Sequence, residues 1–206
     1  MYKNLEKLIE TVRILRSEHG CEWDRAQTHY SLKSNMLEEA YEAVDAIDAG
    51  DLANLREELG DVLLQVLLHS QIADDNGEFN LDDVAKELNN KLIHRHPHVF
   101  GNTKVSSTQD IIDNWDKLKK EEKTDRKSAM DGISKSQAAL MSAQKISKRA
   151  VKQGFEWPNE NSLYECIQSE ITEFKEAETE KDQSHMEEEL GDILFAIVNL
   201  ARWNKI

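Results

Sequence analysis

The chain has 206 residues, of which 39% are apolar, enough to build the core of one or two folded domains. Its 40 acidic residues outnumber its 26 basic ones and give a formal net charge of −14, which disfavours nonspecific binding to nucleic acid or to anionic lipid. The two cysteines, Cys21 and Cys166, have no zinc-like spacing, and no apolar leader or membrane-spanning stretch is visible, so we predict a cytoplasmic protein that does not enter membranes.

Apolar residues recur at helical spacing along most of the chain, which predicts an all-α fold. Asp51 and Asn80 are predicted N-caps, because both residue types accept hydrogen bonds from a first helical turn. Gly60 falls in mid-helix and is predicted to permit close approach of another helix. In the first half we expect helices from Leu5 towards Gly20, at 32–49, at 52–73, at 81–95, and from 107 or 108 through 118. A loop is expected at 21–24, and Leu59 is expected to face inward from the third of these helices.

The second half repeats the first. Gly154-Phe155-Glu156-Trp157 resembles Gly20-Cys21-Glu22-Trp23 at an offset of 134, which becomes 131 in the helices that follow. Such agreement indicates a duplication. We predict a first domain at 1–122, a polar linker at 123–136 and a second domain at 137–206, which stops at Ile206, the counterpart of Asp75.

Both copies carry two pairs of acidic residues at the same spacing. The first copy has Glu39, Glu42, Glu58 and Asp61, which we call the first quartet. The second copy has Glu170, Glu173, Glu189 and Asp192, which we call the second quartet. Residues three apart share a helix face, and an antiparallel hairpin at Gly50 could bring the two pairs of the first copy together. The pattern therefore predicts a metal site, and its all-oxygen ligands favour Mg²⁺ or Mn²⁺. A solvated acidic face and a di-iron bundle are the alternatives, although di-iron sites use Glu-x-x-His pairs.

Basic and aromatic residues follow the first quartet. Lys91 and Arg95 lie four apart on one helix, and Trp115 and Lys119 lie four apart on the next. Beside a metal site these residues could bind phosphate and nucleotide, whereas taken alone they are typical of a surface pair and a core tryptophan. The histidines His94, His96 and His98 surround Pro97 and are interpreted as a capping and packing loop.

Three motifs together resemble one family. They are Leu37 to Glu42 with Glu57 to Asp61, the Gly20 to Asp24 segment, and Lys91 to Phe100. Together these residues are similar to the MazG nucleoside triphosphate pyrophosphohydrolases in their tandem form. The resemblance implies a duplicated all-α helical bundle whose active site lies in four helices shared by a homodimer. It also implies Mg²⁺ and hydrolysis of a nucleoside triphosphate to monophosphate and pyrophosphate.

By position, the resemblance implies that the residues of the first quartet are metal ligands and that Glu38 is a supporting carboxylate. As a hypothesis about the mechanism, we take Glu38 as the candidate general base. Lys91, Arg95 and Trp115 would contact the nucleotide, with Lys119 beside them. In two-copy relatives the later copy is taken as the active one. Here Ser169 replaces the counterpart of Glu38, and the chain stops before the counterparts of the basic and tryptophan helices, so we expect activity in the first copy. The rivals are a non-catalytic regulatory module that dimerises, and a narrower dUTP or phosphoribosyl-ATP pyrophosphohydrolase.

Overall fold

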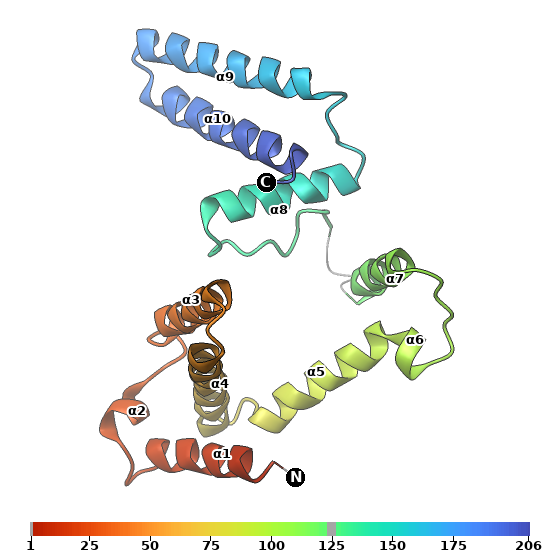
Figure 1. Cartoon of the computed structure of the whole chain (residues 1–206). Helices are drawn as coiled ribbons and strands as arrows, with labels where there is room; N and C mark the ends of the chain where they lie inside the picture. Colours follow the sequence, from red (N-terminus) through yellow and green to blue (C-terminus); the bar gives the residue numbers. More distant parts are fainter. Residues whose placement is uncertain (1, 123–126) are drawn as a thin grey trace. The chain divides into compact units, whose positions relative to one another are not determined.

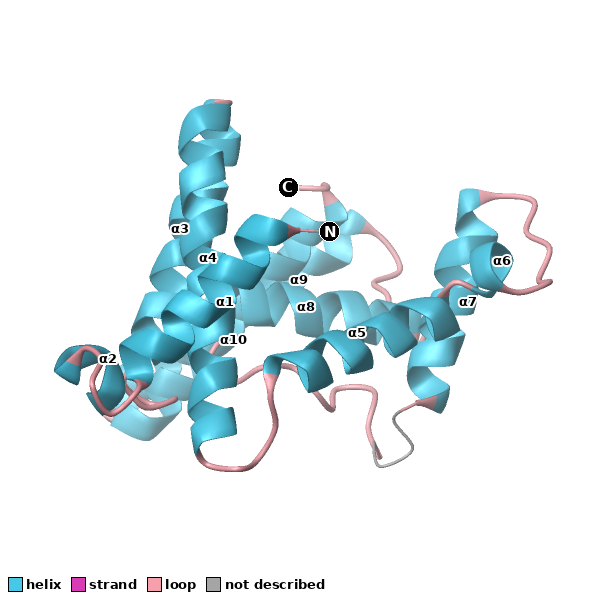
Figure 2. Ribbon diagram, turned by 90° about the horizontal axis from the view of Figure 1, so that it is seen from below, coloured by secondary structure: helices cyan, strands magenta, loops and turns pink. Residues whose placement is uncertain are grey.

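The computed structural model describes residues 2–122 and 127–206, and within these ranges the chain is all-helical, as predicted (Figures 1 and 2). Its elements are α1 (Lys3–Arg16), α2 (Glu22–Ala26), α3 (Lys33–Ala49), α4 (Leu52–Asp75), α5 (Leu81–Arg95), α6 (Pro97–Phe100), α7 (Thr108–Glu121), α8 (Ala139–Lys152), α9 (Glu160–Glu180) and α10 (Gln183–Trp203). None of the helices in the described part of the chain is both long enough and apolar enough to cross a membrane.

Two compact units divide the chain, Met1–Leu118 and Lys119–Ile206. The predicted domain boundary falls a few residues later, and residues 123–126 of the predicted linker lie outside the described residues. The rest of that linker, 127–136, forms turns and bends. The limits of the two domains stay a prediction.

In the first unit, α3 and α4 form a hairpin, and α1 packs against α4 (Figure 1). A buried core cluster joins Val12 of α1 and Leu32, just before α3, to Leu67, Leu68 and Ile72 of α4. Arg16 of α1 donates to Asp75 at the end of α4 over 2.9 Å, and its guanidinium also donates to the Asp24 and Gln27 carbonyls. The hairpin that carries the first quartet is therefore anchored at the far end of α4.

The α3–α4 turn follows from two residues. Gly50 adopts φ +66°, a conformation that side chains disfavour, and ends α3. Asp51 then accepts hydrogen bonds from the backbone N–H groups of Ala53 and Asn54, both at 3.0 Å. The predicted caps are confirmed, because Asn80 also caps α5 in a reciprocal arrangement with Asp83.

The second unit repeats this hairpin with α9 and α10, and α8 packs against α10. Asp182 caps α10 as Asp51 caps α4. A polar network ties α8 to α10: Ser147 donates to Asn199 over 2.7 Å, and Arg202 donates to Ser147 and forms a bidentate pair with Glu156.

Four predictions of local structure were wrong. The first helix ends at Arg16 rather than near Gly20, and residues 22–24 belong to the short helix α2 rather than to a loop. Leu59 is 55% exposed instead of inward-facing. A Cβ at Gly60 would meet nothing within 4 Å, so no helix among the described residues approaches there. The apolar stripe of α4 is wider than the surface that α1 and α3 cover.

Candidate metal and nucleotide site

The α3–α4 hairpin gathers three carboxylates of the first quartet. Glu39 of α3 and Glu58 and Asp61 of α4 each offer an oxygen, and these oxygens lie within 4.8 Å of one another. All three residues are half-buried, whereas Glu42, one turn after Glu39, is exposed at the edge of the group. The hairpin thus brings the two acidic pairs face to face, as their spacing suggests.

Burial and mutual repulsion disfavour ionisation of Glu39 and Glu58. Desolvation raises the pKa of Glu39 above its usual value, and the charges of Asp61, Glu42 and Glu38 raise it further. Desolvation also raises the pKa of Glu58, followed by the charges of Glu42 and Asp61. A divalent cation would relieve this repulsion, and the donor set, carboxylate oxygens alone, fits a hard cation such as Mg²⁺ or Mn²⁺.

The second hairpin forms a comparable acidic group. Oxygens of Glu170 and Glu173 on α9 and of Glu189 on α10 lie within 4.8 Å of one another, and Asp192 is exposed one turn after Glu189. Glu189 is buried, and desolvation followed by the charge of Glu173 raises its pKa. Ser169, which stands in place of a counterpart to Glu38, donates a hydrogen bond to Glu173 over 2.8 Å.

The basic and aromatic residues form a separate group in the first unit. The Arg95 guanidinium lies 5.6 Å from the centre of the Trp115 ring, and the His96 ring meets Trp115 edge-on at 5.0 Å. Lys91 lies one turn before Arg95 on α5. His96 Nδ1 is 2.6 Å from the Leu92 carbonyl oxygen, so the predicted packing role of the histidine loop is confirmed at His96. The pairing of Arg95 with Trp115 joins α5 to α7.

Within the described residues of the first unit, the acidic group of the α3–α4 hairpin and the basic group lie apart. The end of α5 diverges from the α3–α4 hairpin in both views (Figures 1 and 2). Lys119 lies on α7 just beyond Leu118, where the first unit ends. The structure therefore brings Glu39 to Glu58 and Asp61, and Arg95 to Trp115, but it does not bring the two groups together in a single subunit.

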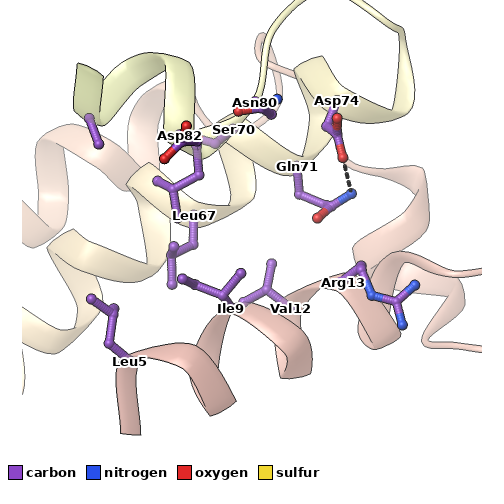
Figure 3. A pocket seen from close by; sticks show the side chains of 12 residues that line it. Leu5, Ile9, Val12, Arg13, Leu67, Ser70, Gln71, Asp74, Asn80 and Asp82 are labelled. Atoms are coloured by element: carbon purple, nitrogen blue, oxygen red, sulfur yellow. Dashed lines mark hydrogen bonds between the residues drawn. The ribbon is translucent and has the colours of Figure 1, made fainter. Parts of the chain in front are cut away.

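A groove that the sequence did not suggest lies elsewhere in the first unit. It encloses about 480 Å³ between α1, α4 and α5 (Figure 3). Leu5, Ile9 and Leu67 form its apolar wall, and Gln71, which donates to Asp74 over 3.5 Å, lies at its polar edge. No member of the first quartet lines this groove.

Both acidic groups fall in segments that match the same family. Residues 27–100 and 159–205 match the MazG nucleotide pyrophosphohydrolase domain. The chain belongs to the MazG family. The matched segments contain both quartets together with Lys91 and Arg95, whereas Trp115 and Lys119 lie outside them.

Two of the chain's relatives are named for their activity. The nucleoside triphosphate pyrophosphohydrolase/pyrophosphatase MazG of Thermotoga maritima is 47% identical over 96% of this chain and 75% of that protein. The nucleoside triphosphate pyrophosphohydrolase of Escherichia coli is 39% identical over 96% of this chain and 77% of its own length. A solved structure, a mazG-related protein from Thermotoga maritima, aligns with a TM-score of 0.48 at 30% identity, over 57% of this chain and 98% of that one.

Proposed function

We propose that this chain is a metal-dependent hydrolase that converts nucleoside triphosphates to nucleoside monophosphates and pyrophosphate. The observation that carries the proposal is the convergence of Glu39, Glu58 and Asp61 on the α3–α4 hairpin of a MazG domain. These three residues and Glu42 would hold Mg²⁺, with Mn²⁺ as the closest substitute. When bound, a divalent cation there polarises phosphate oxygens and lowers the pKa of a water molecule.

The residues of the first copy then have distinct roles. Glu38 lies beside Glu39 on α3 and is exposed, so it can accept the proton of the attacking water. The water oxygen forms a bond to the α-phosphorus, while the bond from that phosphorus to the oxygen shared with the β-phosphorus breaks. Lys91 and Arg95 offset the negative charge of the departing pyrophosphate, and Trp115 offers a flat surface to the base.

We further propose a homodimer in which each subunit completes the site of the other. The hairpin exposes large apolar side chains beside its carboxylates, among them Leu37 (48%), Tyr41 (57%) and Leu59 (55%). Leu88 and Leu92 of α5 are also exposed, at 48% and 41%. Large apolar side chains exposed together on one helix or hairpin are typical of an interaction site. A second subunit would cover both surfaces and bring basic residues to the acidic group.

Of the two copies, the first is the better candidate for catalysis. Glu38 supplies a free carboxylate next to the first quartet, whereas Ser169 occupies the matching position of the second and donates to Glu173. A neutral serine hydroxyl engaged in this way is a poor general base, because its oxygen is only weakly basic.

Product analysis tests the proposed function. A panel of canonical and modified nucleoside triphosphates is incubated with the protein and Mg²⁺, and the products are resolved by ion-exchange chromatography. We expect monophosphate and pyrophosphate in equal amounts, loss of both with a chelator, and recovery when Mg²⁺ is restored. Release of diphosphate and orthophosphate, or nucleotide binding without turnover, would refute the proposal. The panel also identifies the preferred base.

A further inference from the structure

The ring of Trp115, which the proposed function assigns to the base, lies against Arg95 in this structure. The Arg95 guanidinium carbon is 5.6 Å from the centre of the indole ring, which is the geometry of a cation–π contact. Trp115 is half-buried, so Arg95 covers part of the ring surface that would be left for a base. Without a ligand, the first unit therefore presents a ring that is already partly covered.

The residue after Arg95 holds the same ring in place. The His96 ring meets Trp115 edge-on, with centroids 5.0 Å apart and an angle of 88° between the planes. His96 Nδ1 lies 2.6 Å from the Leu92 carbonyl oxygen, and because a carbonyl oxygen only accepts, Nδ1 carries the hydrogen and donates it. This bond to the backbone fixes His96, so the indole keeps a neighbour that does not depend on Arg95.

The guanidinium of Arg95 has a second use in the proposed reaction, which is to bind phosphate oxygens. Its planar fork of N–H groups forms charge-assisted hydrogen bonds to phosphate. Such bonds are stronger than a cation–π contact at a half-buried ring, so a bound triphosphate draws Arg95 away from Trp115. A nucleoside offers no phosphate, and it must displace Arg95 from the ring without that compensation.

Lys91 provides a comparison within the same helix. It lies one turn before Arg95 on α5 and is also assigned to the phosphates. Among the described residues, its ammonium group makes no cation–π contact with Trp115. Of these two cations, Arg95 is therefore the one that links phosphate binding to the ring that would receive the base.

We propose that Arg95 determines specificity for phosphorylated ligands by covering Trp115 until phosphate is present. In the absence of phosphate, the guanidinium lies over the ring and competes with the base. When a triphosphate binds, Arg95 moves to the phosphate oxygens and the base stacks on the uncovered ring, which His96 holds in place. The inference rests on the proposed function, because that function assigns the phosphates to Arg95 and the base to Trp115.

Phosphate binding and base binding are then coupled at one site. A phosphate group that draws Arg95 from the ring strengthens binding of the base, and by linkage a bound base strengthens binding of phosphate by the same factor. Nucleosides bind weakly although they offer Trp115 the same base as a triphosphate does. The site thereby discriminates against ligands that have no phosphate to hydrolyse.

Equilibrium binding tests the inference without turnover. The four common ribonucleosides and their α,β-methylene triphosphates, in which carbon replaces the bridging oxygen, are titrated into the whole chain with Mg²⁺ by calorimetry. In Arg95→Ala we expect nucleosides to bind about two- to fivefold more tightly than in the wild type, and the triphosphate analogues at least about tenfold more weakly. Lys91→Ala should weaken binding of the analogues without strengthening binding of the nucleosides.

Two further measurements assign the gain in nucleoside affinity to the ring. In a Trp115→Leu background, Arg95→Ala should give no gain. In the wild type, pyrophosphate with Mg²⁺ should tighten nucleoside binding about two- to fivefold, and Arg95→Ala should remove this effect. Arg13→Ala, at an arginine whose side chain is 58% exposed on α1, is the control and should change none of these affinities. Circular dichroism checks that each variant keeps its helices.

Three results would overturn the inference. They are the absence of any gain in nucleoside affinity in Arg95→Ala, an equal gain in Lys91→Ala, and a gain that persists in the Trp115→Leu background. A chain that shows the coupling but releases no pyrophosphate from natural triphosphates would instead refute the proposed reaction and leave the inference standing.

Discussion

At the scale of single residues, the raised pKa values of Glu39 and Glu58 make the first site sensitive to pH. Because a folded-state pKa above the unfolded value means tighter proton binding in the native state, this contribution to stability is present at acidic pH. It is lost as pH rises through the raised pKa values. A metal ion competes with the same protons. The stabilising effect of the metal ion should therefore grow as pH rises through the raised pKa values of Glu39 and Glu58.

We predict that Mg²⁺ raises the unfolding temperature little at about pH 4 and increasingly towards about pH 8. Thermal denaturation with Mg²⁺ and with a chelator, at matched ionic strength, measures the difference. In Glu58→Gln, the gain in unfolding temperature caused by Mg²⁺ should depend less steeply on pH. A Mg²⁺ effect that is the same at every pH would show that these carboxylates are not the ligands.

At the scale of elements, two histidines join the segment before α3 to α4. His29 and His69 stack with ring planes 1° apart and centroids 5.0 Å apart, and their Nδ1 atoms lie 2.7 Å apart, so one ring donates to the other. Burial lowers the pKa of His69, and the charge that His29 would carry lowers it further. The pair therefore requires at least one neutral imidazole.

The stability that this pair contributes should be present above the ordinary histidine pKa and lost as pH falls through the lowered value of His69. The sign follows because the unfolded chain binds more protons than the native one in that window. We predict that His69→Gln flattens the decline in unfolding temperature between about pH 7 and about pH 5. His19→Gln, an exposed histidine in the α1–α2 segment, should leave the decline unchanged. An unaltered slope in His69→Gln would contradict this assignment.

Much of the fold could be predicted from the sequence because its signals are local. Helical spacing and the caps at Asp51 and Asn80 depend on neighbouring residues, and the convergence of Glu39 with Glu58 and Asp61 follows once Gly50 closes a hairpin. The five residues of α2 are too few to show a period.

Other features depend on long-range packing. The exposure of Leu59 depends on which surfaces of α4 other helices cover, and sequence periodicity does not give that. The contact between Arg95 and Trp115 joins α5 to α7, whereas helical spacing relates residues only within one helix.

At the scale of the whole molecule, the apolar surface of the α3–α4 hairpin should hold two subunits together. We predict that Val44→Lys, which places a charge on an α3 side chain 49% exposed in the single chain, shifts the protein from dimer to monomer. Ile14→Lys, at a side chain 52% exposed on α1, is the matched control and should leave the dimer intact. Sedimentation velocity distinguishes the two states. A monomeric wild type, or dimerisation unaffected by Val44→Lys, would contradict the proposed dimer.

The central claim is that the first quartet carries catalysis. The most direct measurement is the rate of Mg²⁺-dependent pyrophosphate release by Glu42→Gln, Asp61→Asn and Glu38→Gln, compared with Glu173→Gln as the matched change in the second copy. We predict near-complete loss in the first two variants, a fall of about 10²-fold to 10⁴-fold in kcat for Glu38→Gln, and little change for Glu173→Gln. Intact turnover in Glu42→Gln and Asp61→Asn, or equal loss in Glu173→Gln, would contradict the account.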